Sequence, residues 1–133
     1  MSADVVQRHL ATLGHVPDPS LYAEDLVVEF PYAPRHHTQA LRGRDAYIGF
    51  LTRVVQFFSG YQVGETRVYP TTETGLVVAE YPGSATSNET GKLYKQNYVA
   101  FFSIKDGKIS HIREYYDPVK VLVATDEIPE PGG

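Results

Sequence analysis

Cysteine and tryptophan are both absent from this chain of 133 residues. Without thiols, the protein cannot contain disulfide bonds, thiolate zinc sites, iron–sulfur clusters or a cysteine nucleophile. Basic residues are also few, since 12 Lys and Arg stand against 16 Asp and Glu, and the formal net charge is −4. Because nucleic-acid binders present clustered positive charge, we expect no nucleic-acid partner.

Long apolar runs are missing as well. No stretch approaches the roughly 20 apolar residues that a membrane span requires, and residues 1–10 lack the apolar core of a secretory signal. We therefore expect no membrane association and a cytoplasmic location. A chain of this size buries about two-thirds of its unfolded surface, which is enough to stabilise one domain without disulfides or a structural metal.

Two segments carry apolar residues at helical spacing, and several later segments have the composition of strands. The spacing predicts helices over residues 4–13 and 44–58, ending at Gly14 and at Ser59-Gly60. Between them we expect a single helical turn near residues 20–24, a strand over 26–30 and a polar loop. Short turn segments then separate four predicted strands, at residues 61–69, 76–84, 91–104 and 108–117.

This order of elements predicts the α+β class, with a strongly curved antiparallel sheet wrapped around two to three N-terminal helices. Residues 1–124 are expected to form a single domain. The acidic segment 125–133 is rich in Pro and Gly, so we predict a mobile tail there.

Four phrases of the sequence resemble one known superfamily over about residues 4–123. They are YAEDLVVEFP, GRDAYIGFL, KDGKI and HIREYYDPVKVL. In this order they resemble the nuclear transport factor two-like superfamily, and within it the SnoaL-like polyketide cyclases, phenazine-biosynthesis proteins, limonene epoxide hydrolase and ketosteroid isomerase. The resemblance implies a cone-shaped fold with a deep apolar cavity, and a homodimer packed through the outer face of the sheet. It does not imply one reaction, because the fold carries many.

The catalytic groups of ketosteroid isomerase are mostly missing at the matching positions. The phrase VVQRH puts His9 where that enzyme has an oxyanion-hole tyrosine. Phe30 stands at the place of its general base, and Ala100 aligns with its protonated carboxylic acid. Steroid isomerisation by that mechanism is therefore not expected.

The other relatives share one acid with this chain. Limonene epoxide hydrolase needs an Asp-Arg-Asp relay, but Tyr81 and Gly83 stand near the places of its arginine and first aspartate. The helix histidine of the phenazine proteins aligns with Phe50. The last-strand carboxylate is kept, because the phrase REYYD puts Glu114 at that position.

Glu114 is the first catalytic candidate. Strand periodicity places it on one face with Ile112 and Tyr116, and the resemblance implies that this face lines the cavity. A carboxyl group among aromatic rings is desolvated, which raises its pKa towards the range useful for general acid or base catalysis. The alternative is an ordinary surface glutamate paired with Arg113 or with a lysine on the next strand.

Tyr98 and His9 are the other catalytic candidates. The Tyr98 hydroxyl would stabilise a developing oxyanion, or simply fill the core with its hydrogen bond satisfied. His9 would shuttle protons near neutral pH, or serve as a hydrogen-bonded core histidine. Substrate-binding positions are predicted on the same cavity-facing surfaces: Phe30, Tyr32, Tyr47, Phe50, Leu51, Val54, Gln96, Ala100, Phe102, Ile112 and Tyr116.

Metal and cofactor sites are not predicted. Adjacent histidines such as His36 and His37 rarely bind one ion together, and no third ligand follows at a recognisable spacing. The surrounding arginines would attract an anionic substrate to the cavity entrance or form an ordinary solvated loop. No glycine-rich phosphate loop is present in the sequence.

These observations favour a cofactor-free enzyme acting on a hydrophobic small molecule, by isomerase, cyclase, dehydratase or epoxide-opening chemistry. Glu114 would transfer the proton, and Tyr98 with His9 would stabilise charge on oxygen. A non-catalytic protein that binds an apolar ligand is the alternative, and an adaptor between proteins is a third possibility.

Overall fold

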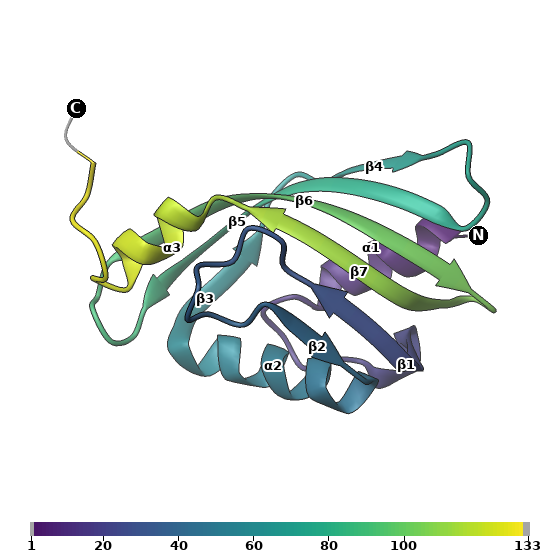
Figure 1. Cartoon of the computed structure of the whole chain (residues 1–133), viewed down its shortest axis with the longest axis horizontal. Helices are drawn as coiled ribbons and strands as arrows, with labels where there is room; N and C mark the ends of the chain where they lie inside the picture. The colour runs from purple at the N-terminus through teal and green to yellow at the C-terminus, as the bar shows by residue number, and fades with distance from the viewer. Residues whose placement is uncertain (1, 132–133) are drawn as a thin grey trace.

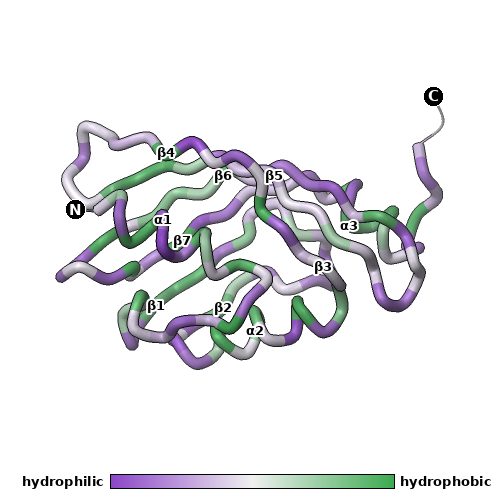
Figure 2. The backbone as a smooth tube through the Cα atoms, turned by 180° about the vertical axis from the view of Figure 1, so that it is seen from behind, coloured by the Kyte–Doolittle hydropathy of each residue, from purple (hydrophilic) through white to green (hydrophobic). Residues whose placement is uncertain are grey.

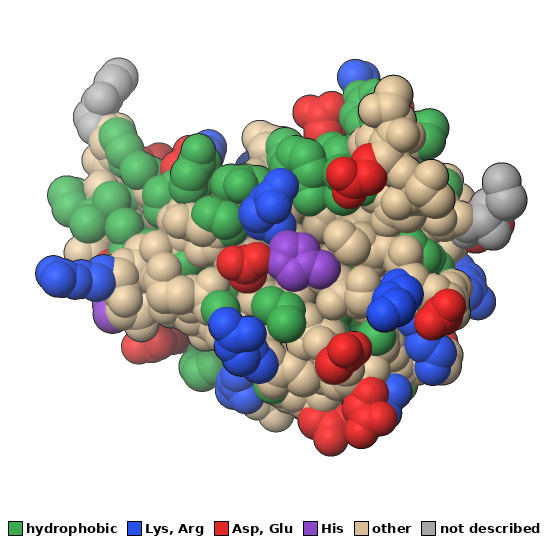
Figure 3. All heavy atoms as spheres, turned by 45° about the vertical axis from the view of Figure 1, so that its right-hand side comes forward, with side chains coloured by type: hydrophobic (Ala, Val, Ile, Leu, Met, Phe, Trp, Pro, Cys, Tyr) green, Lys and Arg blue, Asp and Glu red, His purple; other side chains and the backbone are tan. Residues whose placement is uncertain are grey.

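A curved sheet with helices packed against its inner face forms the structure, a computed structural model that describes residues 2–131 (Figure 1). The elements follow in the order α1 (Ser2–Thr12), a 3₁₀ turn (Pro19–Leu21), β1 (Tyr22–Glu29), β2 (Ala40–Arg42), α2 (Arg44–Phe57), β3 (Phe58–Val63), β4 (Arg67–Pro70), β5 (Leu76–Ser87), β6 (Leu93–Lys105), β7 (Lys108–Tyr116) and α3 (Pro118–Ala124). Within the described residues, no helix is long and apolar enough to cross a membrane. On the face shown in Figure 3, charges of both signs are interspersed without one basic patch.

The sheet is mixed and not closed into a barrel. Its strand order is β2-β1-β7-β6-β5-β3, and β4 also pairs with β5. Strands β1 and β7 run parallel, whereas the other pairs are antiparallel, so the expectation of a purely antiparallel sheet was wrong for this one pair. A parallel pair needs a long crossover, and the whole segment between β1 and β7 supplies it.

The segment predicted as one strand over residues 61–69 is divided into β3 and β4. Both strands pair with β5, and Pro82 lies where the partner changes, since Val63 pairs with Gly83 and Arg67 with Glu80. Proline has no N–H to donate, but its carbonyl accepts a hydrogen bond from the Gly64 N–H at 2.9 Å.

Two short elements fall in segments where no element was predicted. Strand β2 has three residues and pairs only with the end of β1. Helix α3 begins where the Asp117 side chain accepts a hydrogen bond from the Val119 N–H at 3.0 Å, with Pro118 at the first helical position. Phe58, predicted at the end of the long helix, instead begins β3.

The core lies between the inner face of the sheet and the first helix. Val6 and Leu10 of α1 pack in one cluster with Phe102 of β6 and Ile112 of β7, all at most 4% exposed. Hydrophobic stretches occur within β1 and α3 (Figure 2). Burial of apolar surface stabilises a fold by about 25 cal/mol per Å², so this contact contributes to the stability of the domain.

The first part of the predicted tail is hydrogen-bonded to α3. The Thr125 N–H donates to the Val121 carbonyl at 3.0 Å, and the Glu127 N–H donates to the Leu122 carbonyl at 2.9 Å. The single-domain boundary and the mobility of segment 125–133 stay predictions, and residues 132–133 lie outside the described part of the chain.

Gly14 follows α1 and lies very close to the backbone of β3, so a substitution at this position can test that packing. Its φ is +86°, and a Cβ atom there would lie 2.4 Å from the Tyr61 carbonyl oxygen. Gly91 has φ +75° but nothing within 4 Å of its Cβ position. Gly91→Ala should therefore lose about 1–2 kcal/mol of unfolding free energy from backbone strain alone. Gly14→Ala should lose about 1–3 kcal/mol more, measured by urea denaturation. Equal losses would contradict the packing described.

Candidate functional site

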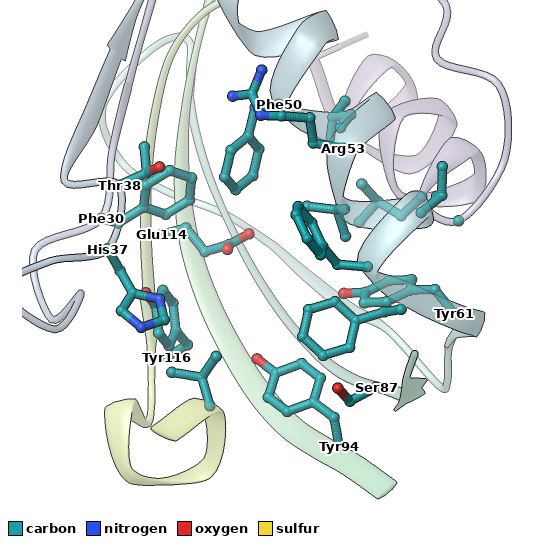
Figure 4. A pocket seen from close by; sticks show the side chains of 18 of the residues that line it. Phe30, His37, Thr38, Phe50, Arg53, Tyr61, Ser87, Tyr94, Glu114 and Tyr116 are labelled. Carbon is teal, nitrogen blue, oxygen red and sulfur yellow. The ribbon is translucent and has the colours of Figure 1, made fainter. Parts of the chain in front are cut away.

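A cavity of about 600 Å³ lies beside the inner face of the sheet, within the size range of small-molecule sites (Figure 4). Side chains of α2 form one wall, and aromatic side chains of β3, β6 and β7 form another. The loop before β2 and the segment after α3 also contribute, so residues far apart in sequence meet around one space. We refer to this space as the pocket.

Glu114 of β7 points its carboxylate into the pocket, between Phe50 and Tyr116 in Figure 4. The residue is only partly exposed, and the surface that stays accessible faces the pocket. Burial raises the pKa of this carboxyl group from 4.5 to about 7, because the charged form loses its hydration. A hydrogen bond from Tyr81 opposes this effect and lowers the pKa in part.

Tyr81 holds one oxygen of that carboxylate. Its hydroxyl donates to Glu114 Oε2 at 2.5 Å. The two residues stand on strands separated by β6, in a register that sets Ala100 opposite both Ala79 and Glu114. Because alanine is small, the tyrosine and the glutamate can meet above Ala100. Burial, followed by the nearby Glu114 charge, raises the pKa of Tyr81 well above 10, so Tyr81 remains a donor.

Other tyrosines surround the Glu114–Tyr81 pair. The hydroxyls of Tyr94 and Tyr98 are 3.2 Å apart, and the rings of Tyr81 and Tyr98 are stacked with centroids 5.1 Å apart. Gly83 makes room for this cluster, because a Cβ atom there would lie 2.8 Å from both the Tyr61 hydroxyl and the Tyr98 ring. Burial raises the pKa of Tyr98, so its hydroxyl stays protonated and can donate to a ligand.

All of the predicted binding residues on the long helix line the pocket, and several strand residues do not. Pocket-lining positions among the predicted set are Phe30, Tyr47, Phe50, Leu51, Val54, Tyr98, Glu114 and Tyr116. Buried positions that do not line it are Gln96, Ala100, Phe102 and Ile112. Tyr32 is 60% exposed and packs against Tyr115, outside the pocket.

His9 lies in the core and does not reach the pocket. Its Nδ1 atom is 2.6 Å from the Tyr22 hydroxyl, and its ring contacts those of Tyr47 and Phe102. Burial lowers its pKa from 6.5 to about 3, so the ring is neutral at physiological pH. The structure therefore separates His9 from Glu114 and places it as a hydrogen-bonded core histidine, the alternative that the sequence left open.

Tyr81 is the important residue that the sequence did not single out. Its position stood out only as the place where a relative carries an arginine. The signal lies in the strand register, because Tyr98 is opposite both Tyr81 and Tyr116. Aligning the three long strands by their turns would have set Tyr81 level with Tyr116, two residues from Glu114 along β7. Periodicity within a single strand does not contain that information.

A second polar group lines the pocket at its edge, namely His36, His37 and Glu127. We call these three residues the His–Glu cluster. Hydrogen bonds from Thr125, His36 and His37 lower the pKa of Glu127 from 4.5 to about 2, although partial desolvation acts against them. The Glu127 carboxylate is therefore ionised, and it offers two oxygens to cationic or hydrogen-bond-donating partners.

The chain belongs to the family of SnoaL-like domains, whose family model matches residues 7–112. It is 29% identical over 104 residues to the Bacillus subtilis protein YesE, covering 78% of this chain and 71% of that protein. A PhzA/B-like protein of Pseudomonas aeruginosa is 24% identical over 104 residues, covering 78% of this chain and 73% of that relative. The resemblance drawn from the sequence is therefore confirmed.

Solved structures show the same fold. A Bacillus subtilis protein with a provisional assignment as an isomerase superposes with a TM-score of 0.86 at 24% identity, covering 96% of this chain and 94% of its own. A phenazine biosynthesis-related protein of Pseudomonas aeruginosa gives 0.85 at 20% identity, with 99% and 84% covered. A Catenulispora acidiphila protein with a ketosteroid isomerase-like fold, solved with trimethylamine, gives 0.77 at 15% identity and covers 95% of each chain.

The raised pKa of Glu114 predicts a pH-dependent stability difference. The folded protein binds this proton more tightly than the unfolded chain, so ionisation of Glu114 destabilises the fold as the pH rises from about 4.5 through about 7. Glu114→Gln still accepts from Tyr81 but cannot ionise. At pH 8 the variant should be more stable than wild type by on the order of 2–3 kcal/mol.

This gain should disappear near pH 4, where Glu114 of the wild type is protonated. Urea denaturation across this pH range measures the difference, and Glu130→Gln, at an exposed position, controls for the loss of one carboxylate. A constant difference between Glu114→Gln and wild type from pH 4 to pH 8 would show that the carboxyl group is not desolvated.

Proposed function

We propose that this SnoaL-like domain is a general acid/base enzyme acting on a hydrophobic small molecule, with Glu114 as the proton-transferring group. The observation that carries the proposal is the position of its carboxyl group: inside an aromatic pocket, held by Tyr81, with a pKa raised to about 7. A group with this pKa is present in both protonation states at neutral pH, so it can accept a proton in one step and return it in the next.

The two carboxylate oxygens of Glu114 have different roles in this proposal. Oε2 accepts the Tyr81 hydrogen bond, which fixes the plane of the carboxylate. Oε1 is then the oxygen available to a substrate C–H or O–H group in the pocket. Holding the base in one orientation removes part of the entropic cost of proton transfer. Tyr81 is a positioning residue in this scheme, because it acts through Glu114.

Tyr98 is the proposed donor to the substrate oxygen that gains charge. It lines the pocket, and burial keeps its hydroxyl protonated. Its hydroxyl is already 3.2 Å from that of Tyr94, so a ligand oxygen would join an existing chain of hydroxyl groups. Such donors stabilise charge most effectively where water is excluded, as in an aromatic pocket. Isomerisation, cyclisation, dehydration and epoxide opening all use a proton transfer of this kind.

A non-catalytic ligand-binding protein is the second candidate function. Two positions at which relatives carry catalytic groups are occupied here by Phe30 and Phe50, and their rings pack together with centroids 5.3 Å apart. Both residues line the pocket. They therefore present apolar surface at positions where the related enzymes carry polar catalytic groups. Binding of an apolar ligand without turnover at any pH would favour this candidate.

The catalytic proposal predicts the kinetics of two variants on a panel of hydrophobic ketones, enones and epoxides. With a compound that the wild type converts, Glu114→Gln should lower kcat by about 10²–10⁴-fold, because it removes the proton carrier. Tyr81→Phe should keep the carrier and shift the pH profile of kcat to higher pH, since the Tyr81 hydrogen bond lowers the Glu114 pKa.

Tyr69→Phe serves as the matched control, because Tyr69 is 42% exposed, bonds to Glu80 and does not line the pocket. It should leave both kcat and the pH profile as in the wild type. Turnover by Glu114→Gln at the wild-type rate would rule out Glu114 as the proton carrier.

We also propose that the protein forms a homodimer through the outer face of the sheet, and that it acts in the cytoplasm. Phe101, Arg113 and Tyr115 are half-buried on this face, with the Arg113 guanidinium 4.8 Å from the Phe101 ring centroid. A second copy packed on this face would cover this aromatic surface.

If the protein is a dimer, a substitution that disrupts this face should lower its mass in solution. Light scattering at micromolar concentration should give twice the chain mass for the wild type and the single-chain mass for Phe101→Glu, because a carboxylate in an apolar interface is costly to bury. Lys120→Glu, at an exposed position of α3 away from this face, serves as the charge-changed control. A wild-type protein that is monomeric at this concentration would contradict the proposal.

A further inference from the structure

The His–Glu cluster brings three metal-ligand side chains together from distant parts of the chain. His36 and His37 lie in the loop between β1 and β2, and Glu127 lies after α3. His36 Nε2 is hydrogen-bonded to Glu127 Oε1, and His37 Nε2 is 2.8 Å from Glu127 Oε2. One ligand atom from each residue lies within 4.8 Å of the others, and among the described residues this is the group of three that meets this condition.

Surrounding hydrogen bonds orient the cluster. Thr125 Oγ1 donates to Glu127 Oε2 at 2.5 Å, which directs the carboxylate towards the histidines. On the other side, Gln39 Nε2 donates to the carbonyls of Pro34 and His37 at 2.7 and 3.3 Å, so it closes the loop that carries both rings. Polar groups of this kind commonly fix the ligands of metal sites and tune their affinity.

The donor set matches a transition-metal ion. Two imidazoles and one carboxylate are typical ligands of zinc and of other divalent first-row ions, with metal–ligand distances of about 2.0–2.2 Å. Ligand atoms around a tetrahedral ion are then about 3.4 Å apart, so the cluster needs only small side-chain rotations. Such rotations are easy here, because the His36 side chain is 65% exposed and the Glu127 side chain 28% exposed.

We propose that His36, His37 and Glu127 bind a divalent transition-metal ion of the zinc class at the edge of the pocket. All three residues line the pocket, and three protein ligands leave a coordination position for water or a ligand oxygen. The ion would join the segment after α3 to the loop before β2 and offer an anchor for an anionic or carbonyl group of a pocket ligand. Glu114 is not one of its ligands, so this site is independent of the acid/base proposal.

The sequence argued against metal binding because no third ligand follows the histidine pair at a recognisable spacing. The fold supplies this ligand from 90 positions away along the chain. Two adjacent histidines alone would bind a metal ion weakly. The Glu127 carboxylate provides the third ligand. Hydrogen bonding between the two histidines and Glu127, without any ion, is the competing explanation of the same geometry, and metal titration separates the two.

The test is a titration of tag-free, chelator-treated protein with zinc chloride by isothermal calorimetry, repeated with cobalt chloride by visible absorption. Wild type should bind one ion per chain, and the cobalt form should show the absorption bands of nitrogen–oxygen coordination. His37→Ala and Glu127→Gln should each weaken zinc binding by roughly 100-fold or more, because loss of an outer hydrogen-bond partner alone costs about 10–100-fold in metal sites.

Matched controls come from the same regions of the chain. His15→Ala removes another pocket-lining histidine, and Glu130→Gln removes another carboxylate of the C-terminal segment. Both should bind zinc as the wild type does. Zinc should also raise the melting temperature of the wild type and controls more than that of His37→Ala and Glu127→Gln, since an ion bound to the folded state stabilises it.

Two results would overturn the proposal. One is the absence of stoichiometric zinc binding by the wild type. The other is zinc binding that His37→Ala and Glu127→Gln leave unchanged, which would place the ion on other surface histidines. Circular dichroism of each variant establishes that it is folded, and His36→Ala provides an independent ligand substitution if either of the others is not.

Discussion

Desolvation of the Glu114 carboxyl group is the constraint on which the proposed function of this domain depends. A carboxyl group in water is almost fully ionised at neutral pH, because its pKa lies far below 7. It is therefore poorly suited to general acid/base catalysis at that pH. The aromatic pocket removes that hydration, and the Tyr81 hydroxyl returns one hydrogen bond, so the pKa settles at about 7. Loss of hydration raises this pKa and the Tyr81 hydrogen bond lowers it, and the loss of hydration is the larger effect.

Small residues at defined positions in the sheet make this arrangement possible. Ala79 and Ala100 are fully buried on the inner face and leave space above them for the Tyr81 and Glu114 side chains to meet. Gly83 leaves space in the same way for Tyr61 and Tyr98. Packing density in a protein interior leaves little freedom, so a larger residue at any of these positions would displace the aromatic side chains that desolvate Glu114.

The sequence predicted the elements that local patterns control. Helical spacing located α1 and α2, and turn residues located β5, β6 and β7, while the resemblance identified the family and Glu114. The parallel pairing of β1 with β7 was missed because strand direction within a sheet depends on the crossover, not on either strand's own residues. Short elements such as β2 carry too few residues for a periodic signal.

The candidate site was harder to predict than the fold, for the same physical reason. Whether a buried residue faces the cavity or the core depends on contacts between elements: Tyr98 and Phe102 lie on the same face of β6, yet only Tyr98 lines the pocket. His9 occupies a catalytic position of a relative, but here the Tyr22 hydroxyl satisfies it within the core. Glu127 joins the histidine loop through the fold alone, since the intervening chain gives no spacing signal.

The ionisation of Glu114 tests the central claim most directly. Carbon-13 NMR of the side-chain carboxyl resonances, followed from pH 3 to pH 9 and assigned with Glu114→Gln, reports its pKa without any need for a substrate. The midpoint should lie near 7 in the wild type and should be higher in Tyr81→Phe. A midpoint near 4.5, unaffected by Tyr81→Phe, would show that the carboxyl group is hydrated and unsuited to the proposed chemistry.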